Sequence, residues 1–294
     1  MDCRNVTDGP IFLGGLSHSG KTPLRIALDA HSRIAMTRRT YMWTRFYGRF
    51  GDLAQPEQRE RCLDAMMRDE GIRELDPNVM QIRTEFARGD ATYGRLFALF
   101  HAQHATRMGK ARWGDQLGLV EAFADRIFQA YPDASVIHLI RDPRRNGWDH
   151  TYRHVGRLGW LTARWLFSAD LAARNLARYP DRYLVVRYET LAAEPEPTLR
   201  RITSFVGEEY ESQTLDALPG QAAGSPELSP NDAAAAFVER YASDRLEALG
   251  YVADPLERTR LGAARYIVKW PANRTAMLAW DAFGASSVRR RASR

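Results

Sequence analysis

The chain has 294 residues, of which 45% are hydrophobic, 27% charged and 11% aromatic, and this composition excludes disordered, collagen-like and low-complexity proteins. No apolar run reaches the roughly 18 residues that a membrane-spanning helix needs, and the polar start does not resemble a secretory signal. Two cysteines are too few for a disulfide framework or a zinc site. We therefore expect a soluble, cytoplasmic protein. The net charge of +6 arises in residues 256–294, which hold nine basic and two acidic residues, so it does not indicate that the main part of the chain binds nucleic acid.

The first predicted elements form a strand, a loop and a helix. Residues 10–13 are apolar and lie between Gly-Pro and Gly-Gly, which predicts a buried strand. Residues 15–20 form the loop. Residues 22–31 have apolar side chains at helical spacing and Pro23 in the first turn, which predicts a helix.

The rest of the chain alternates in the same way. Further strands are expected at residues 32–36, 112–115, 135–140 and 183–186, and helices within 41–108, at 119–131, within 145–179 and at 195–205. Buried strands that alternate with helices predict an α/β fold with a parallel sheet flanked by helices. We expect one domain over residues 1–255 and a basic extension over 256–294 that is partly helical and disordered at its end.

Residues 15–22 match the phosphate-loop pattern G-x-x-x-x-G-K-[ST] at every fixed position. Glycines let backbone N–H groups point at an anion, the following helix adds its positive end, and the lysine reaches the outer anionic group. The alternative is a glycine-rich turn that binds nothing. Lys21 is one of only three lysines beside 39 arginines, which favours a site that needs a compact ammonium, and we expect it to be exposed on the loop.

The loop alone is also typical of kinases that use magnesium and ATP. Such an enzyme needs an acidic residue at a neighbouring strand end to hold the metal, and Asp142 follows the strand at 135–140. Arginines surround Asp142 in the sequence, however, which favours a local salt bridge over a metal ligand. The edge of the sheet at which the strand 135–140 ends is therefore expected to bind a second anion.

Four segments together resemble the sulfotransferases that use 3′-phosphoadenosine 5′-phosphosulfate (PAPS), especially the bacterial and tyrosylprotein-type branch. The segments are residues 17–31, 113–116, 136–144 and 186–191, with weaker similarity at 198–207 and 245–251. The resemblance implies a fold like that of P-loop nucleotide hydrolases, with PAPS as co-substrate and no metal. It also implies that a sulfuryl group passes to an acceptor hydroxyl and that adenosine 3′,5′-bisphosphate is released.

The resemblance also implies roles for individual residues. The donor's 5′-phosphosulfate would bind to the loop residues Ser17, Ser19, Gly20, Lys21, Thr22 and Pro23. Arg141 and Arg153 would hold the 3′-phosphate, and Tyr188 would lie against the nucleotide. Asp149 belongs to the same predicted donor site, although the family has a serine at that position.

The resemblance does not identify the catalytic base. We take Lys21, His18 and Asp115 as the catalytic candidates. His18 either donates to the bridging oxygen or caps the loop. Asp115 is the first choice for the base because the open end of a parallel sheet gathers ligands, whereas Glu85, His101 and His104 are expected on helix surfaces.

A run of cations and aromatics follows the second predicted strand. Arg38, Arg39, Tyr41 and Trp43 are candidates for binding the acceptor, because such side chains grip a sugar face or an acidic group by stacking and paired hydrogen bonds. The alternative is the start of a helix with a solvated basic face.

Two other functions remain open at this point. A magnesium-dependent small-molecule kinase is supported by the complete phosphate-loop pattern, and a non-catalytic nucleotide-binding protein by Asp149 and the missing base. The expected partner is a small-molecule, carbohydrate or lipid-linked acceptor, and no nucleic acid. The basic extension is expected to pack on the domain, with contact to an anionic membrane surface as the alternative.

Overall fold

The computed structural model describes residues 9–38, 40–144, 158–219, 233–252 and 270–279. Its centre is a five-stranded sheet in the order β2-β3-β1-β4-β5, and every neighbouring pair is parallel. The strands are β1 Ile11–Gly14, β2 Ile34–Arg38, β3 Arg112–Gln116, β4 Ser135–Ile140 and β5 Tyr183–Arg187. The predicted α/β fold with a parallel sheet is confirmed.

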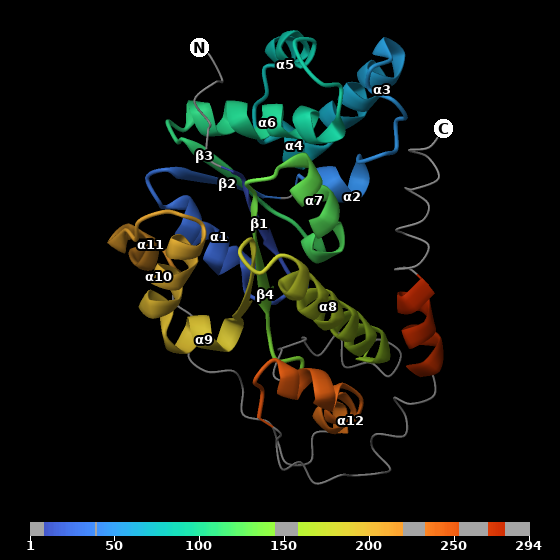
Figure 1. Ribbon diagram of the computed structural model, residues 1–294, viewed down its shortest axis with the longest axis vertical. Helices are drawn as coiled ribbons and strands as arrows, with labels where there is room; N and C mark the ends of the chain where they lie inside the picture. Colours follow the sequence, from blue (N-terminus) through green and yellow to red (C-terminus); the bar gives the residue numbers. More distant parts are fainter. Residues whose placement is uncertain (1–8, 39, 145–157, 220–232, 253–269, 280–294) are drawn as a thin grey trace.

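Helices cover both faces of this sheet (Figure 1). One face carries α1 Lys21–Asp29, α9 Tyr188–Ala193, α10 Pro195–Phe205 and α11 Ser212–Asp216, and the other carries α6 Tyr93–Arg107, α7 Ala124–Ala130 and α8 Leu158–Arg178. Side chains of β1 alternate between the two cores: Ile11 and Leu13 pack with Leu24 of α1, whereas Phe12 packs with Phe97 of α6. The central strand is therefore buried on both sides, as its apolar sequence predicts.

Four further helices follow β2 and extend the second core. They are α2 Met42–Arg45, α3 Pro56–Met67, α4 Glu70–Arg73 and α5 Val79–Phe86, and they lie beside α6 at one end of the molecule (Figure 1). The predicted single helix at 119–131 is wrong in detail. Leu119 has φ 60°, a 3₁₀ turn η2 follows at Val120–Phe123, and only then does α7 begin.

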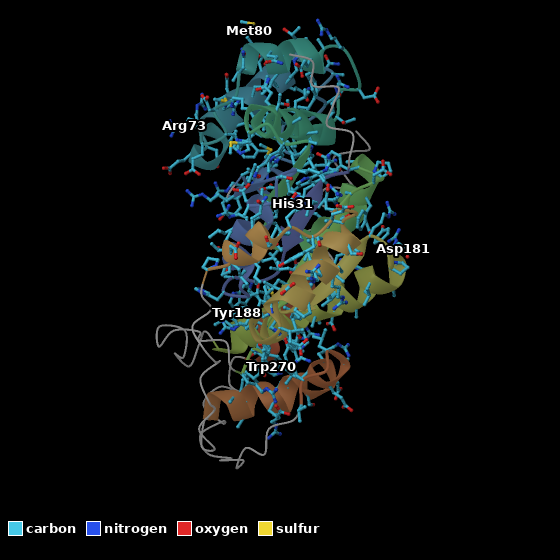
Figure 2. All side chains as sticks on the ribbon, turned by 90° about the vertical axis from the view of Figure 1, so that its left-hand side faces the viewer. His31, Arg73, Met80, Asp181, Tyr188 and Trp270 are labelled. Atoms are coloured by element: carbon cyan, nitrogen blue, oxygen red, sulfur yellow. The ribbon has the colours of Figure 1, made fainter. Side chains whose placement is uncertain are left out.

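Part of the basic extension contacts the domain. Residues 270–279 are helical, and the Trp270 ring centroid lies 4.8 Å from that of Tyr241 on α12 Ala233–Ala248 (Trp270 is labelled in Figure 2). Arg274 Nη2 lies 3.2 Å from Asp170 Oδ2 of α8. The residues expected to be disordered, 289–294, lie outside the described part of the chain. Within the described part, no helix has both the length and the apolar character that crossing a membrane requires.

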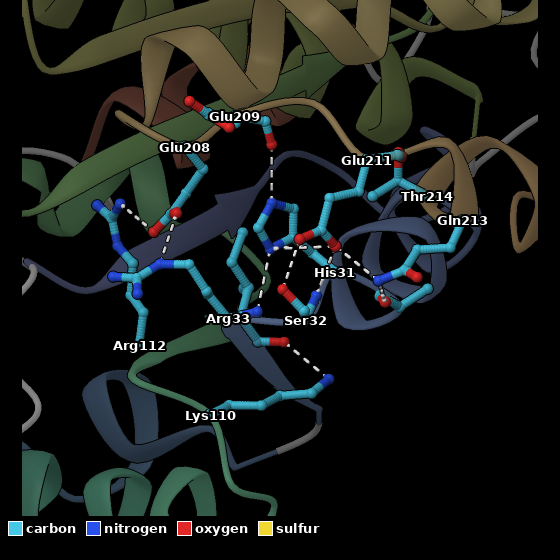
Figure 3. Close-up of polar contacts among 12 residues, drawn as sticks. His31, Ser32, Arg33, Lys110, Arg112, Glu208, Glu209, Glu211, Gln213 and Thr214 are labelled. Atoms are coloured by element: carbon cyan, nitrogen blue, oxygen red, sulfur yellow. Dashed lines mark hydrogen bonds and ion pairs between the residues drawn. The ribbon is translucent and has the colours of Figure 1, made fainter.

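The amino ends of the strands are held by charged side chains that pair with one another. Figure 3 shows Glu208 bridging Arg33, at 3.0 Å, and Arg112, at 3.5 Å. His31 accepts from Arg33 N–H at Nδ1 and donates from Nε2 to Glu209 O at 2.9 Å. A cleft of about 530 Å³ opens among these residues, but both of its guanidiniums are paired with Glu208, so this network stabilises the fold.

Candidate active site at the carboxyl edge of the sheet

The loop after β1 has the conformation that its glycines permit. Gly15 has φ 119° and Gly20 has φ 91°, both in the left-handed region, and α1 begins directly after Gly20. A Cβ at Gly15 would lie 2.1 Å from Leu139 O, and one at Gly20 would lie 2.2 Å from Tyr188 Cδ2. The two glycines therefore let the loop lie tightly against Leu139 of β4 and Tyr188 at the start of α9, with the N-terminus of α1 beside it.

Lys21 folds back into this loop. Its Nζ donates to Gly15 O at 2.6 Å and to Leu16 O, and the residue is only 8% exposed. The expectation that Lys21 is exposed is wrong, because its stem is covered and its ammonium turns to carbonyls of the loop. Burial lowers the pKa of Lys21 to about 8; the nearby carboxylate of Glu121 raises it and the guanidinium of Arg164 lowers it.

Buried polar atoms without partners gather at this edge. Among the described residues, nine such side-chain atoms occur, and five of them belong to residues that end or follow a strand: Ser19 Oγ, Gln116 Oε1, Glu121 Oε2, Arg141 Nε and Arg187 Nε. A buried polar atom without a partner costs about 1–3 kcal/mol. Ser19, which is 2% exposed, stands in the phosphate loop itself, so the residues present fit an anionic group that would accept from it.

Arg141 and Tyr188, which directly follow β4 and β5, meet the loop. Arg141 Nη1 donates to His18 O at 3.3 Å, and its guanidinium lies 4.1 Å from the centroid of the Tyr188 ring. Tyr188 in turn packs against Gly20. Residues that follow β1, β4 and β5 thus meet around the guanidinium of Arg141. Ser17 and His18 are exposed on the loop, whereas Thr22 is exposed and Pro23 half-buried in the first turn of α1.

Asp142 has a structural partner. Its carboxylate accepts from Arg144 Nε at 3.0 Å and from Arg144 Nη2 at 2.8 Å, and its backbone N–H donates to Glu189 at 2.8 Å. The local salt bridge expected for Asp142 is therefore present, and Arg144 rather than Arg141 is its partner. The carboxylate that a magnesium site would need is held by a guanidinium, and no group of three potential metal ligands occurs in the described residues.

Asp115 lies at the carboxyl end of β3 and is fully buried. Thr37 donates to its Oδ1 at 2.9 Å and Thr40 to its Oδ2 at 2.5 Å, while His101 Nε2 is 3.7 Å from Oδ2. Burial raises the pKa of Asp115 to about 6 against the opposing effect of the two hydroxyls, and it lowers that of His101 to about 3. Asp115 is therefore an anion at neutral pH beside a neutral imidazole that stacks on Trp113.

The predicted acceptor residues are not gathered on one surface. Arg38 is exposed and its Nε lies 3.5 Å from Glu74, and Tyr41 lies beneath the guanidinium of Arg45 at 4.3 Å. Trp43 is 2% exposed and stacks on Tyr47 with ring centroids 4.8 Å apart. The structure thus gives Trp43 a place in the core. Arg39, Asp149 and Arg153 lie outside the described residues.

The core position of Trp43 leads to a stability prediction. Trp43→Ala is expected to lower the free energy of unfolding by about 3–5 kcal/mol, because it leaves a cavity among large aromatic rings. Arg38→Ala, at an exposed neighbouring position, is expected to change it by less than about 0.5 kcal/mol. Urea denaturation of both variants measures the difference, and an unchanged midpoint for Trp43→Ala would contradict the assignment to the core.

Four residues near the loop were not identified as site residues from the sequence. Glu121 stands in η2, His138 is inside β4, and Arg164 and Ser168 are on α8. Only the fold brings them beneath the phosphate loop. The single available signal was a histidine within the apolar strand at 135–140, since an interior imidazole requires hydrogen-bond partners.

Comparison with known proteins decides the family. A sequence profile described as the sulfotransferase family matches residues 10–212. The chain belongs to the sulfotransferase family. Its enzymatic class is accordingly that of a sulfotransferase, and the matched residues include the phosphate loop, Asp115, Arg141 and Tyr188.

Solved structures show that the sulfotransferase fold extends over most of the chain. The sulfotransferase domain of the olefin synthase from Synechococcus PCC 7002 superposes with a TM-score of 0.53 and 17% identity, covering 84% of this chain and 97% of that domain. The sulfotransferase domain from the curacin biosynthetic pathway gives a TM-score of 0.51 and 17% identity, covering 88% and 97%. No curated protein sequence matches this chain significantly.

Proposed function

We propose that this sulfotransferase transfers a sulfuryl group from PAPS to the hydroxyl of a small-molecule, carbohydrate or lipid-linked acceptor. The observation that carries the proposal is the convergence of Lys21, the partnerless Ser19 hydroxyl and Arg141 on the loop after β1. The occupied Asp142 carboxylate speaks against the kinase alternative.

Different residues of the chain would bind the two ends of the donor. The Ser19 hydroxyl, the N-terminal amides of α1 and the Lys21 ammonium would hold the 5′-phosphosulfate and neutralise the charge that develops on it. Arg141 would hold the 3′-phosphate with its guanidinium, which already rests on the Tyr188 ring. PAPS, when bound, supplies the sulfuryl group. His18, exposed at the tip of the loop, would donate to the leaving oxygen.

Asp115 is our proposed general base for the acceptor hydroxyl. The rate should fall as the pH drops through about 6, the pKa that burial gives this carboxyl, because a protonated carboxyl cannot accept a proton. Below that pH we expect about a tenfold loss in kcat/KM per pH unit. A pH series on the wild type and on Asp115→Asn measures this. An acidic limb that persists unchanged in an active Asp115→Asn variant would contradict the role.

The proposed donor is tested by thermal denaturation with nucleotides. Adenosine 3′,5′-bisphosphate at about 100 times its Kd should raise Tm by about 5 °C, whereas ATP with magnesium should leave it nearly unchanged. The Lys21→Ala variant serves as the control for binding at the loop. A larger shift with ATP and magnesium would favour the kinase alternative instead.

A further inference from the structure

A directed chain of buried hydrogen bonds runs beneath the phosphate loop. The Tyr183 hydroxyl lies 2.8 Å from His138 Nδ1, His138 Nε2 lies 3.1 Å from Ser168 Oγ, and Ser168 donates to Glu121 Oε1 at 2.6 Å. None of the four side chains is more than 1% exposed. Since Ser168 gives its proton to Glu121, its oxygen accepts from His138 Nε2–H, and His138 Nδ1 then accepts from Tyr183. The chain of donors therefore ends on the carboxylate of Glu121.

The second oxygen of that carboxylate faces the loop. Glu121 Oε2 is buried and has no hydrogen-bond partner, and it would lie 3.4 Å from a Cβ built on Gly14. Gly14 directly precedes Gly15 and Leu16, whose carbonyls hold the Lys21 ammonium. A buried carboxylate is stable only when opposite charge or hydrogen bonds compensate it. The Ser168 hydroxyl, itself oriented by His138, donates to Oε1, so the opposite charge for Oε2 comes from the side of the loop.

We propose that Glu121 is a positioning residue of the sulfotransferase, whose carboxylate, oriented by Ser168 and His138, keeps the Lys21 ammonium charged inside the loop. The role in catalysis rests on the proposed function, because the charged ammonium matters there for binding an anionic donor. The coupling between the two side chains is a property of the chain itself and can be measured without a ligand.

Titratable side chains from three elements face Lys21. Glu121 of η2 raises the pKa of the lysine, Arg164 of α8 lowers it, and His138 of β4 stays neutral near pH 7 because burial lowers its own pKa. Burial is the largest effect and brings the pKa of Lys21 to about 8. Without the carboxylate, burial and Arg164 would act unopposed, and Lys21 would lose its proton at a lower pH.

The titration of Lys21 can be observed directly, because the chain has only three lysines and their signals can be told apart. In protein labelled with ¹³C at lysine Cε, the signal of Lys21 is assigned with Lys21→Ala and followed from pH 6 to 11. We expect a titration midpoint near 8 in the wild type and a midpoint about one pH unit lower in Glu121→Gln. Asp125→Asn is the matched control, since Asp125 is an exposed carboxylate on α7 that binds Arg178; it should leave the midpoint of Lys21 unchanged. An equal midpoint in Glu121→Gln and the wild type would overturn the proposal.

Activity measurements distinguish a failure of this proposal from a failure of the proposed function. At pH 8 Glu121→Gln should lose about fivefold in kcat/KM with PAPS, and at pH 6.5 less than about twofold, since Lys21 is charged there in both proteins. If circular dichroism shows that Glu121→Gln does not fold, Glu121→Asp is measured; its withdrawn carboxylate should still lower the midpoint, and an unchanged midpoint would overturn the proposal. A shifted midpoint in a protein that does not use PAPS would support the coupling and refute the donor.

Discussion

Lys21→Ala is expected to lower kcat/KM for sulfuryl transfer by at least about 100- to 1000-fold, the loss typical of removing a group that stabilises developing negative charge. The side chain is buried and supplies the only ammonium in the phosphate loop. The substitution also removes the two hydrogen bonds to Gly15 O and Leu16 O. We expect the fold to survive, because their net contribution of about 1–3 kcal/mol is small beside a typical domain stability of about 5–15 kcal/mol.

Lys110→Ala is the matched control for this variant. Lys110 also donates to two backbone carbonyls, those of Asp29 and Ile34, but it lies at the amino edge of the sheet (Figure 3). It should lose comparable stability and keep kcat/KM within about twofold of the wild type. Steady-state kinetics and urea denaturation of both variants give the comparison. Near-normal transfer by a folded Lys21→Ala protein would contradict the role of the loop.

Arg141→Ala is expected to weaken PAPS binding by about tenfold or more, the equivalent of about 1.5–3 kcal/mol for a charge-assisted contact. The guanidinium is held at the site by His18 O and the Tyr188 ring, so little ordering is needed when the nucleotide binds. Calorimetric titration measures the change. The fold should be retained, since Asp142 depends on Arg144 and not on Arg141.

Two comparisons make the Arg141 experiment specific. Adenosine 5′-phosphosulfate lacks the 3′-phosphate, so its affinity should change little in Arg141→Ala. Arg182→Ala removes a guanidinium that likewise lies over an aromatic ring, 4.6 Å from the centroid of Phe128, and donates to a backbone carbonyl, that of Pro132. It should bind PAPS normally. An equal loss of affinity for both nucleotides would show that Arg141 does not hold the 3′-phosphate.

The fold was largely predictable because its signals are local. Buried parallel strands appear as short apolar runs, and Pro195 marks the first turn of α10, whose observed end at Phe205 agrees with the predicted one. The phosphate loop was equally clear, since glycine positions and the following helix are contiguous in sequence. The helix expected at 119–131 was less clear. The left-handed Leu119 and the 3₁₀ turn stand where the chain packs against β1 and α8, which are contacts that the local sequence does not indicate.

The site was less predictable because burial depends on distant parts of the chain. Lys21 was expected to be exposed as a loop residue, yet it is buried, and the charged groups that act on it include Glu121 and Arg164, 100 and 143 positions further along the chain. Trp43 follows a basic run that suggested ligand binding, but α6 places Phe97 against it. Such contacts depend on the tertiary fold, and the hydrophobic periodicity of the sequence does not predict them.

Donor use through the phosphate loop can be tested by following label from ³⁵S-PAPS into a panel of phenolic, carbohydrate and lipid-linked alcohols, beside a parallel reaction with γ-³²P-ATP and magnesium. We predict that ³⁵S appears in one acceptor class together with an equal amount of adenosine 3′,5′-bisphosphate, and that Lys21→Ala removes the transfer. Transfer of ³²P from ATP with no ³⁵S transfer, or ³⁵S transfer that survives in Lys21→Ala, would contradict the account.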